Sequence, residues 1–344
     1  MNPRQMNKLA ALAATAAGAA GVVVARRRAG ARGVDHRRPV QGSPLTGRPR
    51  TVETEDGLAL SVVEHGAQDS ATATVVLAHG YVQSSALWAG QVRDLIDARP
   101  DLRVVAYDHR GHGRSPRTPR DRATISQLGR DLARVIEAVA PTGPVILVGH
   151  SMGGMTIMAL AEEHPGLVGE RVAAVAFVGT SSGGLAEVTY GLPAPVAALM
   201  RRALPRLNAR NVKAELAGRA RHVGALDARM IFPRGADREL VATALEVHRA
   251  CSAETVAAFL DTFRGHDRVH ALQGLSHVQT LVVVGDKDAL CPVAHSHAIA
   301  AALPASELVI YPGVGHMVHL ERREEVSRRL VGLVDRALAR ELAA

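Results

Sequence analysis

The stretch Val145-Ile-Leu-Val-Gly-His-Ser-Met-Gly-Gly154 decides the fold of this chain of 344 residues. Its first four residues are apolar and β-branched in character, which is typical of a fully buried strand. A helical pattern follows from Met155 to His164. Between strand and helix lies the pattern Gly-x-Ser-x-Gly, in which a serine occupies a sharp turn that exposes its hydroxyl, and the flanking glycines remove Cβ atoms that would collide there. We therefore predict that Ser151 is a nucleophile.

The composition predicts a large folded body. Hydrophobic residues make up 47% and charged residues 22% of the chain, as expected for a packed core. Aromatic residues make up 3%, too few for a surface that stacks single-stranded nucleic acid. Cys251 and Cys291 lack Cys-x-x-Cys spacing, and two free thiols are expected rather than one disulfide.

The basic charge of the chain is confined to one end. Residues 1–50 hold ten of the 41 Lys and Arg residues but only one of the 33 Asp and Glu residues. Residues 51–344 therefore carry a net charge of −1, although the whole chain carries +8. Since nucleic-acid binding needs a basic surface on the folded body, DNA and RNA are not expected partners.

Short apolar runs alternate with helical stretches through the body of the chain. The expected strands are Thr51–Glu53, Leu58–Glu64, Thr74–Ala78, Arg103–Tyr107, Val145–Val148, Val172–Val178, Thr280–Val284 and Glu307–Tyr311. The expected helices are Leu87–Ala98, Thr124–Val139, Met155–His164, Ala294–Ala302 and Glu324–Leu342. The first two strands are expected to form a hairpin. This alternation predicts an α/β fold with a mostly parallel eight-stranded sheet flanked by helices, and ligands beyond the carboxyl ends of the strands.

One interval breaks the alternation. Residues 181–275 show helical patterns but no convincing strand. Nearly a hundred residues are far more than a crossover between neighbouring strands needs. We interpret this interval as a helical cap inserted within a domain of residues 51–344; a helical layer that covers nothing is the alternative.

A serine hydroxyl needs a base to take its proton, and the base needs a carboxylate to orient it. Two loops downstream of Ser151 can supply them. Gly285-Asp286-Lys287-Asp288 ends one expected strand, and Gly315-His316 follows the next. Because both loops end strands at the edge where Ser151 is exposed, these groups can meet.

At this point the chain resembles the α/β-hydrolase superfamily, in its serine esterase and lipase branch, from about residue 51 to its end. The resemblance rests on motifs in a fixed order: His79-Gly80 after a strand, Asp108-His-Arg-Gly-His-Gly-Arg-Ser115, the serine turn, Gly285-x-x-Asp288 and Gly315-His316. The resemblance implies an α/β-hydrolase fold whose cap precedes the strand that bears the catalytic acid.

The same resemblance implies a catalytic triad of Ser151, Asp288 and His316. Relatives usually carry the acid three residues after the strand-ending glycine, which favours Asp288 and leaves Asp286 as the alternative. Some relatives take the acid from the end of the preceding strand, but Gly179–Ser182 has no carboxylate there. His112 is expected to hold its tight loop together rather than to react.

Two main-chain N–H groups are expected to bind the oxyanion that forms during acyl transfer. Met152, directly after the nucleophile, should supply one of them, and Tyr81, after His79-Gly80, the other. Since the second donor is a main-chain group, the identity of Tyr81 is expected to matter less than the position of its backbone.

These residues predict a serine hydrolase that cleaves a carboxylic ester of an apolar or acyl substrate through an acyl-enzyme on Ser151. Other serine-dependent chemistry on the same fold is the alternative, namely that of thioesterases, perhydrolases, C–C hydrolases and proline iminopeptidases. A membrane-tethered binding module without catalysis is a lesser alternative. The expected partner is a small-molecule ester or acyl compound, and the oligomeric state is not predicted.

No cofactor and no metal ion are expected. Cys291, His295 and His297 could suggest a metal site, but the two histidines lie two residues apart on an expected helix and point in different directions. The Asp108–Ser115 run lacks the Gly-Lys-Ser/Thr ending of a phosphate-binding loop.

Residues 1–50 form an apolar and basic segment followed by a linker. Residues 9–25 are uncharged and rich in Ala, Gly and Val, and Arg26-Arg27-Arg28 follows directly. This length is at the lower limit for spanning a membrane, and the arginine triplet favours an anchor whose following domain stays on the cytoplasmic side. A cleaved signal peptide with a secreted domain and a tail that does not insert are the alternatives.

Overall fold

The computed structural model describes residues 47–68, 70–219 and 223–342. Contacts divide the chain into Met1–Arg38 and Pro39–Ala344, and all the described residues belong to the second unit. The expected anchor at residues 9–25 and nearly all of the 1–50 segment lie outside the described residues, so both stay predictions. In the part of the chain that the structure describes, no helix is long and apolar enough to cross a membrane.

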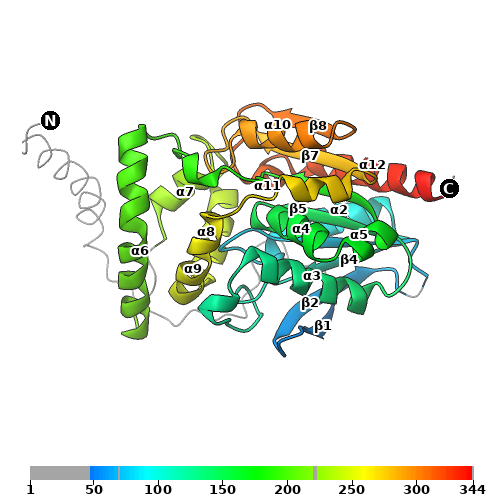
Figure 1. Ribbon diagram of the computed structural model, residues 1–344, viewed down its shortest axis with the longest axis horizontal. Coiled ribbons are helices and arrows are strands. Elements are labelled where there is room, and N and C mark those ends of the chain that lie inside the picture. The colour runs from blue at the N-terminus through cyan, green and yellow to red at the C-terminus, as the bar shows by residue number, and fades with distance from the viewer. Residues whose placement is uncertain (1–46, 69, 220–222, 343–344) are drawn as a thin grey trace, which may run out of the picture. The chain divides into compact units, whose positions relative to one another are not determined.

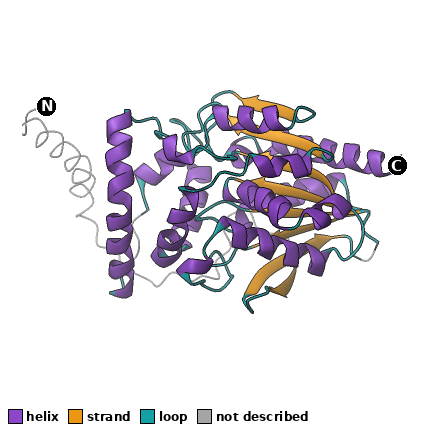
Figure 2. Cartoon of the chain, in the orientation of Figure 1, coloured by secondary structure: helices purple, strands orange, loops and turns teal. Residues whose placement is uncertain are grey.

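An eight-stranded sheet forms the centre of the molecule (Figures 1 and 2). Its strands are β1 (Arg48–Glu53), β2 (Ala59–Gly66), β3 (Ala73–Ala78), β4 (Leu102–Tyr107), β5 (Val145–His150), β6 (Val172–Val178), β7 (Gln279–Gly285) and β8 (Glu307–Tyr311). The order across the sheet is β1-β2-β4-β3-β5-β6-β7-β8. β1 pairs with β2 and β2 with β4 in antiparallel fashion, and all other pairs are parallel. The expected eight-stranded, mostly parallel sheet and its leading hairpin are confirmed.

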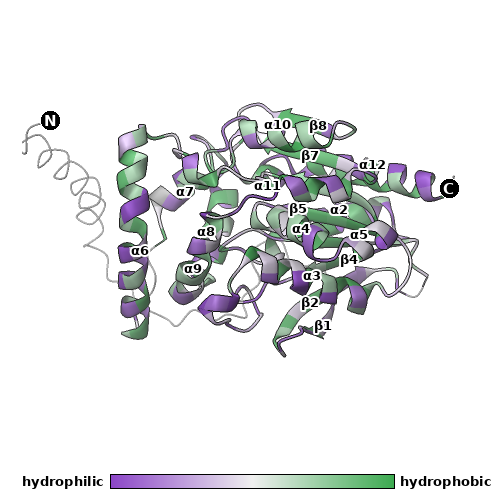
Figure 3. Ribbon diagram, in the orientation of Figure 1, coloured by the Kyte–Doolittle hydropathy of each residue, from purple (hydrophilic) through white to green (hydrophobic). Residues whose placement is uncertain are grey.

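Helices cover both faces of this sheet. They are α2 (Ala89–Ala98), α3 (Ile125–Val139), α4 (Met152–Glu163), α5 (Pro165–Arg171), α10 (Val293–Ala302), α11 (Val318–Glu321) and α12 (Arg323–Glu341). Successive strand residues face opposite cores: Val76 packs with residues of α3, α4 and α10, whereas Val75 and Leu77 pack with α2 and α12. The central strands are buried on both sides, which explains their continuous apolar runs, seen as green arrows in Figure 3.

The helices agree with the sequence except around α4. This helix starts at Met152, three residues before the expected start at Met155. Gly153 and Gly154 are weak helix formers, and tertiary packing rather than propensity places them in the first turn. The short α5 was not expected, because Gly166 and Gly169 interrupt its pattern.

Between β6 and β7 the described residues contain helices and turns but no strand. The helices are α6 (Ala194–Leu216), α7 (Ala225–Ile231), α8 (Arg238–Ala250) and α9 (Ala253–Phe259), with short 3-10 turns η3 (Leu185–Glu187), η4 (Leu260–Phe263) and η5 (His270–Leu275). In Figure 1, α6, α8 and α9 lie beside the sheet rather than on its helical layers. The turn η5 differs from the rest, because Ala271, Leu272 and Leu275 belong to the core beneath α4. Residues 270–275 therefore pack with the body of the protein, and the expected extent of the cap, about residues 181–275, stays a prediction.

Candidate active site

Ser151 lies at the turn between β5 and α4. Its φ angle is 51°, in the left-handed region that non-glycine residues rarely adopt. The main chain holds this strained conformation on both sides: its N–H donates to the carbonyl of Val178 at 2.9 Å, and its carbonyl accepts from the Thr180 hydroxyl at 2.6 Å. Strain of this kind persists only where surrounding contacts enforce it.

The glycines around Ser151 allow strand and helix to approach each other. A Cβ atom on Gly149 would lie 2.4 Å from the main chain of Gly153, and one on Gly153 would lie 2.2 Å from the carbonyl oxygen of Ala78. Gly154, which the sequence pattern did not single out, is equally constrained, because its Cβ would lie 2.6 Å from Thr180. The Gly-x-Ser-x-Gly pattern therefore has the steric basis that its spacing predicts.

Asp288 and His316 lie together in the structure. The His316 Nδ1 atom is 2.8 Å from Asp288 Oδ2, and both side chains are almost fully buried. The other carboxylate oxygen, Oδ1, accepts the main-chain N–H groups of Leu290 and Cys291 at 2.9 and 2.8 Å. Each oxygen of Asp288 thus has its own hydrogen-bonding role, and one of the two is directed at the imidazole.

Asp286, the alternative acid, occupies a different position. Its side chain is partly exposed, accepts the main-chain N–H of Gly313 at 2.7 Å and pairs with Lys287 at 3.0 Å. Lys287 lowers the pKa of the Asp286 carboxyl. The geometry therefore favours Asp288 as the partner of His316 and gives Asp286 the role of closing a turn.

His150 connects the serine turn to the histidine loop. Its Nε2 atom lies 3.0 Å from the carbonyl oxygen of His316, and its ring centroid lies 4.7 Å from that of His316. The Nδ1 atom lies 3.1 Å from Gln83 Oε1, which also accepts the main-chain N–H of Gly80 at 3.0 Å. His150, directly before Ser151, therefore links the serine turn to the loop that carries His316. Sequence reasoning did not find Gln83, and only its place in the loop after His79-Gly80 could have indicated it.

The two expected oxyanion donors belong to different elements of the fold. Met152 is the first residue of α4, where the first N–H groups of a helix have no partner within it. Tyr81 lies in the loop after β3, whose Gly80 is held by Gln83. Val82, which follows Tyr81, has a φ angle of 61°, so this loop is strained as well.

The Asp108–Ser115 loop packs behind the Tyr81 loop. The main-chain N–H of His109 donates to His79 Nε2 at 3.0 Å, and Asp108 accepts the N–H of Ser85 at 2.7 Å. His112 Nδ1 lies 3.0 Å from the carbonyl of Arg110, so its expected structural role is confirmed. Burial lowers the pKa of His79 to about 4 and that of His112 to about 3, so both rings are neutral.

Glu321 was not expected at the site. Its Oε1 accepts the main-chain N–H of Gly315, directly before His316, at 2.9 Å. Burial raises the pKa of its carboxyl to about 7, with Asp288 and His316 among the charges that act on it. This residue supports the loop that presents His316.

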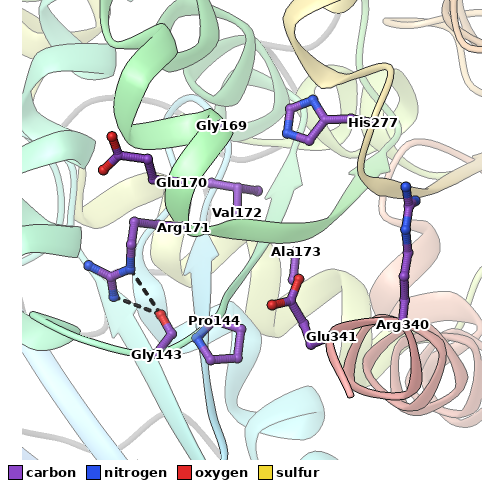
Figure 4. Close-up of a pocket in the computed structure, with 10 residues that line it drawn as sticks. All are labelled: Gly143, Pro144, Gly169, Glu170, Arg171, Val172, Ala173, His277, Arg340 and Glu341. Atoms are coloured by element: carbon purple, nitrogen blue, oxygen red, sulfur yellow. Dashed lines mark hydrogen bonds between the residues drawn. The ribbon is translucent and has the colours of Figure 1, made fainter. Parts of the chain in front are cut away.

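The described residues also bear on the expected thiols, on metal binding and on a second cavity. Cys251 and Cys291 are both buried, and neither forms a disulfide in the described part of the chain, as expected. Among the described residues, no group of three or more His, Cys, Asp or Glu side chains is arranged to hold a metal ion. A surface cavity of about 400 Å³ lies at the end of the sheet where β5 and β6 begin, opposite to the end that carries Ser151. Figure 4 shows its lining, in which Arg171 donates hydrogen bonds to the carbonyl of Gly143. It is distinct from the Ser151 site.

Comparison with known proteins agrees with this geometry. A family model described as serine aminopeptidase, S33, matches residues 69–323. A monoacylglycerol lipase of Mycolicibacterium smegmatis is 29% identical over 265 residues, which are 73% of this chain and 84% of that protein. The protein named "Putative carbamate hydrolase RutD" of Caulobacter sp. (strain K31) is 40% identical over 112 residues, 33% of this chain. That match spans only 40% of the length of the relative.

The fold has close counterparts among solved structures. An esterase from Thermogutta terrifontis superposes with a TM-score of 0.67 at 23% identity, covering 84% of this chain and 99% of that one. At this identity the likeness shows the fold alone, while the family match covers most of the chain. The chain therefore belongs to the serine aminopeptidase S33 family of the α/β-hydrolase superfamily.

Proposed function

We propose that this protein hydrolyses carboxylic esters of small apolar or acyl substrates through an acyl-enzyme on Ser151. The observation that carries the proposal most is the buried hydrogen bond between Asp288 Oδ2 and His316 Nδ1, with His150 joining this pair to the serine turn. A buried carboxylate that holds one ring nitrogen leaves the other nitrogen free to act as a base.

In the first half of the proposed reaction, the Ser151 hydroxyl attacks the ester carbonyl carbon while His316 Nε2 takes its proton. Negative charge then develops on the carbonyl oxygen. The main-chain N–H groups of Met152 and Tyr81 bind this oxyanion, which is the kind of preorganised stabilisation that contributes most in acyl transfer. When the tetrahedral intermediate collapses, the C–O bond to the alcohol breaks, and the alcohol leaves with the proton from His316.

In the second half, water replaces the alcohol. His316 takes a proton from the water, and the resulting hydroxide attacks the acyl carbon of the Ser151 ester. Collapse of the second intermediate releases the carboxylic acid and returns the proton to Ser151. Asp288 stays anionic throughout, orients the imidazole and stabilises the imidazolium that forms in each half.

The cap supports an apolar acyl group as the substrate. Phe259 and Ala258 of α9 pack with Met152 at the start of α4. Tyr81 and Phe263 border the same apolar cluster. An acyl chain bound over the serine turn would therefore meet apolar side chains from the cap.

Two measurements on the purified full chain test this function. A fluorophosphonate probe should label the wild type and Ser276→Ala, whose serine is exposed and remote, but not Ser151→Ala. The two proteins that the probe labels should hydrolyse p-nitrophenyl esters, measured over a series of acyl-chain lengths. Ser151→Ala should hydrolyse none of them. Equal labelling of all three proteins would overturn the assignment of Ser151.

The bond that is cleaved can be tested in the same assay. Thioester, amide and carbamate analogues with a common acyl group should react more slowly than the ester. An amino-acid amide or a carbamate that reacts faster would keep the serine mechanism but replace the ester as the substrate.

A further inference from the structure

The side chain of Tyr81 reaches from the body of the protein into the cap. Its phenolic hydroxyl donates a hydrogen bond to the main-chain carbonyl of Val256 in α9. Its ring makes an edge-to-face contact with Phe263 of η4, with 5.0 Å between the ring centroids. The identity of Tyr81 therefore has structural consequences that a main-chain role alone does not explain.

The cap segment that receives Tyr81 is itself fixed to the body. The Thr255 hydroxyl donates to the carbonyl of Gly111 at 2.9 Å, and Thr262 Oγ1 accepts the main-chain N–H of Ile125 at 3.0 Å. Both contacts come from the stretch Ala253–Phe263, which also carries Val256. Hydrogen bonds at two points therefore hold this stretch against the body.

The other expected oxyanion donor, Met152, belongs to a cluster that includes residues of the same stretch of the cap. Met152 packs in one apolar cluster with Ala258 and Phe259 of α9. The side chains of both donor residues, Tyr81 and Met152, thus contact the same stretch of the cap, although the residues themselves belong to different loops.

The Tyr81 loop needs such a support. Val82 is β-branched and has a φ angle of 61°, a conformation that costs free energy and is retained only where contacts enforce it. Gln83 fixes the Gly80 side of the loop by accepting the Gly80 N–H. The Tyr81 hydroxyl provides a second point of attachment, through its hydrogen bond to the Val256 carbonyl of the cap.

We propose that Tyr81 is a positioning residue: its phenolic hydroxyl, held by the carbonyl of Val256, fixes the direction of the Tyr81 main-chain N–H toward the oxyanion. The cap then contributes to transition-state stabilisation and not only to substrate binding. This inference rests on the proposed ester hydrolysis through Ser151.

The variant Tyr81→Phe tests the proposal, because it removes the hydroxyl and keeps the ring and the main-chain donor. Complete loss of an oxyanion donor costs on the order of 10²–10³-fold in kcat, so a donor that is kept but loosened should lose about tenfold. The KM for p-nitrophenyl butyrate should change less than about twofold, since only the transition state is affected. The inhibition constant of a trifluoromethyl ketone, which forms an oxyanion on the serine, should rise by the same factor as kcat/KM falls.

Two controls accompany this variant. Tyr311→Phe removes a tyrosine hydroxyl at the end of β8, where the side chain packs against the core that α2 and α12 share, and should leave kcat unchanged. Rates are divided by the number of sites that a fluorophosphonate titrates, so that unfolded protein does not count as a loss of kcat. A decrease that disappears after this correction would overturn the proposal.

The remaining outcomes separate this inference from the proposed function. An unchanged kcat in Tyr81→Phe, or a raised KM with normal kcat, would assign the hydroxyl to binding or to nothing and overturn the positioning role. The proposed function would stand in those cases as long as Ser151→Ala is inactive. Full activity of Ser151→Ala would instead refute the proposed function itself.

Discussion

Asp288 and His316 are 28 residues apart in sequence, and their side chains meet at 2.8 Å in a buried hydrogen bond. β7 and β8, which precede them, pair in parallel, with Gly285 opposite Tyr311. The parallel register therefore places both loops at the same edge of the sheet. The contact depends on strand pairing as much as on the two residues themselves.

Asp288→Asn should lower kcat by on the order of 10³–10⁴-fold, because an amide can hold the imidazole in the wrong tautomer and cannot stabilise the imidazolium. Asp286→Asn is the matched control, since that side chain closes a turn at Gly313 and pairs with Lys287, and its kcat should change less than about threefold. Steady-state ester hydrolysis measures both. A larger loss in Asp286→Asn would exchange the two assignments.

Gly149→Ala should lower the free energy of unfolding by about 1–3 kcal/mol, because its Cβ would lie 2.4 Å from the main chain of Gly153. Gly169→Ala in α5 is the control: a Cβ there meets nothing within 4 Å, and stability should rise by about 0.5–1 kcal/mol. Urea unfolding followed by circular dichroism gives both values. Equal stability of the two variants would contradict the steric argument for the serine turn.

The buried histidines should make the protein sensitive to acid. Burial lowers the pKa of His79 to about 4 and those of His112 and His319 to about 3, so the folded chain stays neutral at these rings while the unfolded chain takes up protons below pH ~6.5. Their stabilising contribution is therefore complete above that pH and is lost as the pH falls toward 4. Each ring contributes a slope of about 1.4 kcal/mol per pH unit.

Urea titrations at pH 7, 6 and 5 measure this slope. His319→Gln should reduce the slope by about 1.4 kcal/mol per pH unit, which corresponds to one proton fewer taken up on unfolding. His297→Gln, at an exposed position of α10, should leave the slope unchanged. A free energy of unfolding that stays constant from pH 7 to 5 would rule out the proposed neutral cluster.

Glu321 should have the opposite effect on stability as the pH rises from 4.5 to 7. Its folded pKa of about 7 lies above the ordinary value of 4.5, so ionisation costs stability as the pH rises from 4.5 to 7, and the cost is complete above 7. Glu321→Gln avoids this cost and keeps an oxygen that can accept the Gly315 N–H. Because the carboxyl is only partly buried, the variant should be more stable by about 1–2 kcal/mol at pH 8.

At pH 5 the Glu321→Gln variant and the wild type should differ little. The comparison is made by thermal or urea unfolding of both proteins in matched buffers. A variant that is less stable at pH 8 would show that the negative charge of Glu321 is stabilising where it lies.

The sheet could be predicted because its central strands are buried on both faces and therefore appear as continuous β-branched runs, as in Val145–Val148. The start of α4 could not be predicted, since Gly153 and Gly154 are weak helix formers. They are required at these positions because Ala78 and Thr180 lie too close for any larger residue. Short elements such as α5 carry too few residues for a periodic pattern. Local signals therefore failed where long-range packing decides.

For the candidate site, sequence motifs predicted Asp288 and His316, and the structure brings them together. The roles of Ser151, Tyr81 and Met152 stay predictions. Gln83 and Glu321 carry no motif, because each acts by accepting a main-chain N–H from a residue whose place is set by the fold. The hydrogen bond between Tyr81 and Val256 could not be predicted either. Its acceptor is a main-chain carbonyl, which every residue carries and which therefore leaves no signal in the sequence.

That last contact has a consequence for how the cap can evolve. The acceptor for the Tyr81 hydroxyl is a backbone oxygen, which every residue type supplies. Mutations along α9 can therefore reshape the surface that meets the acyl chain without removing the group that Tyr81 requires. Substitutions in the cap can therefore change which substrates bind. The hydrogen bond that positions the Tyr81 main-chain N–H toward the oxyanion is retained through such substitutions.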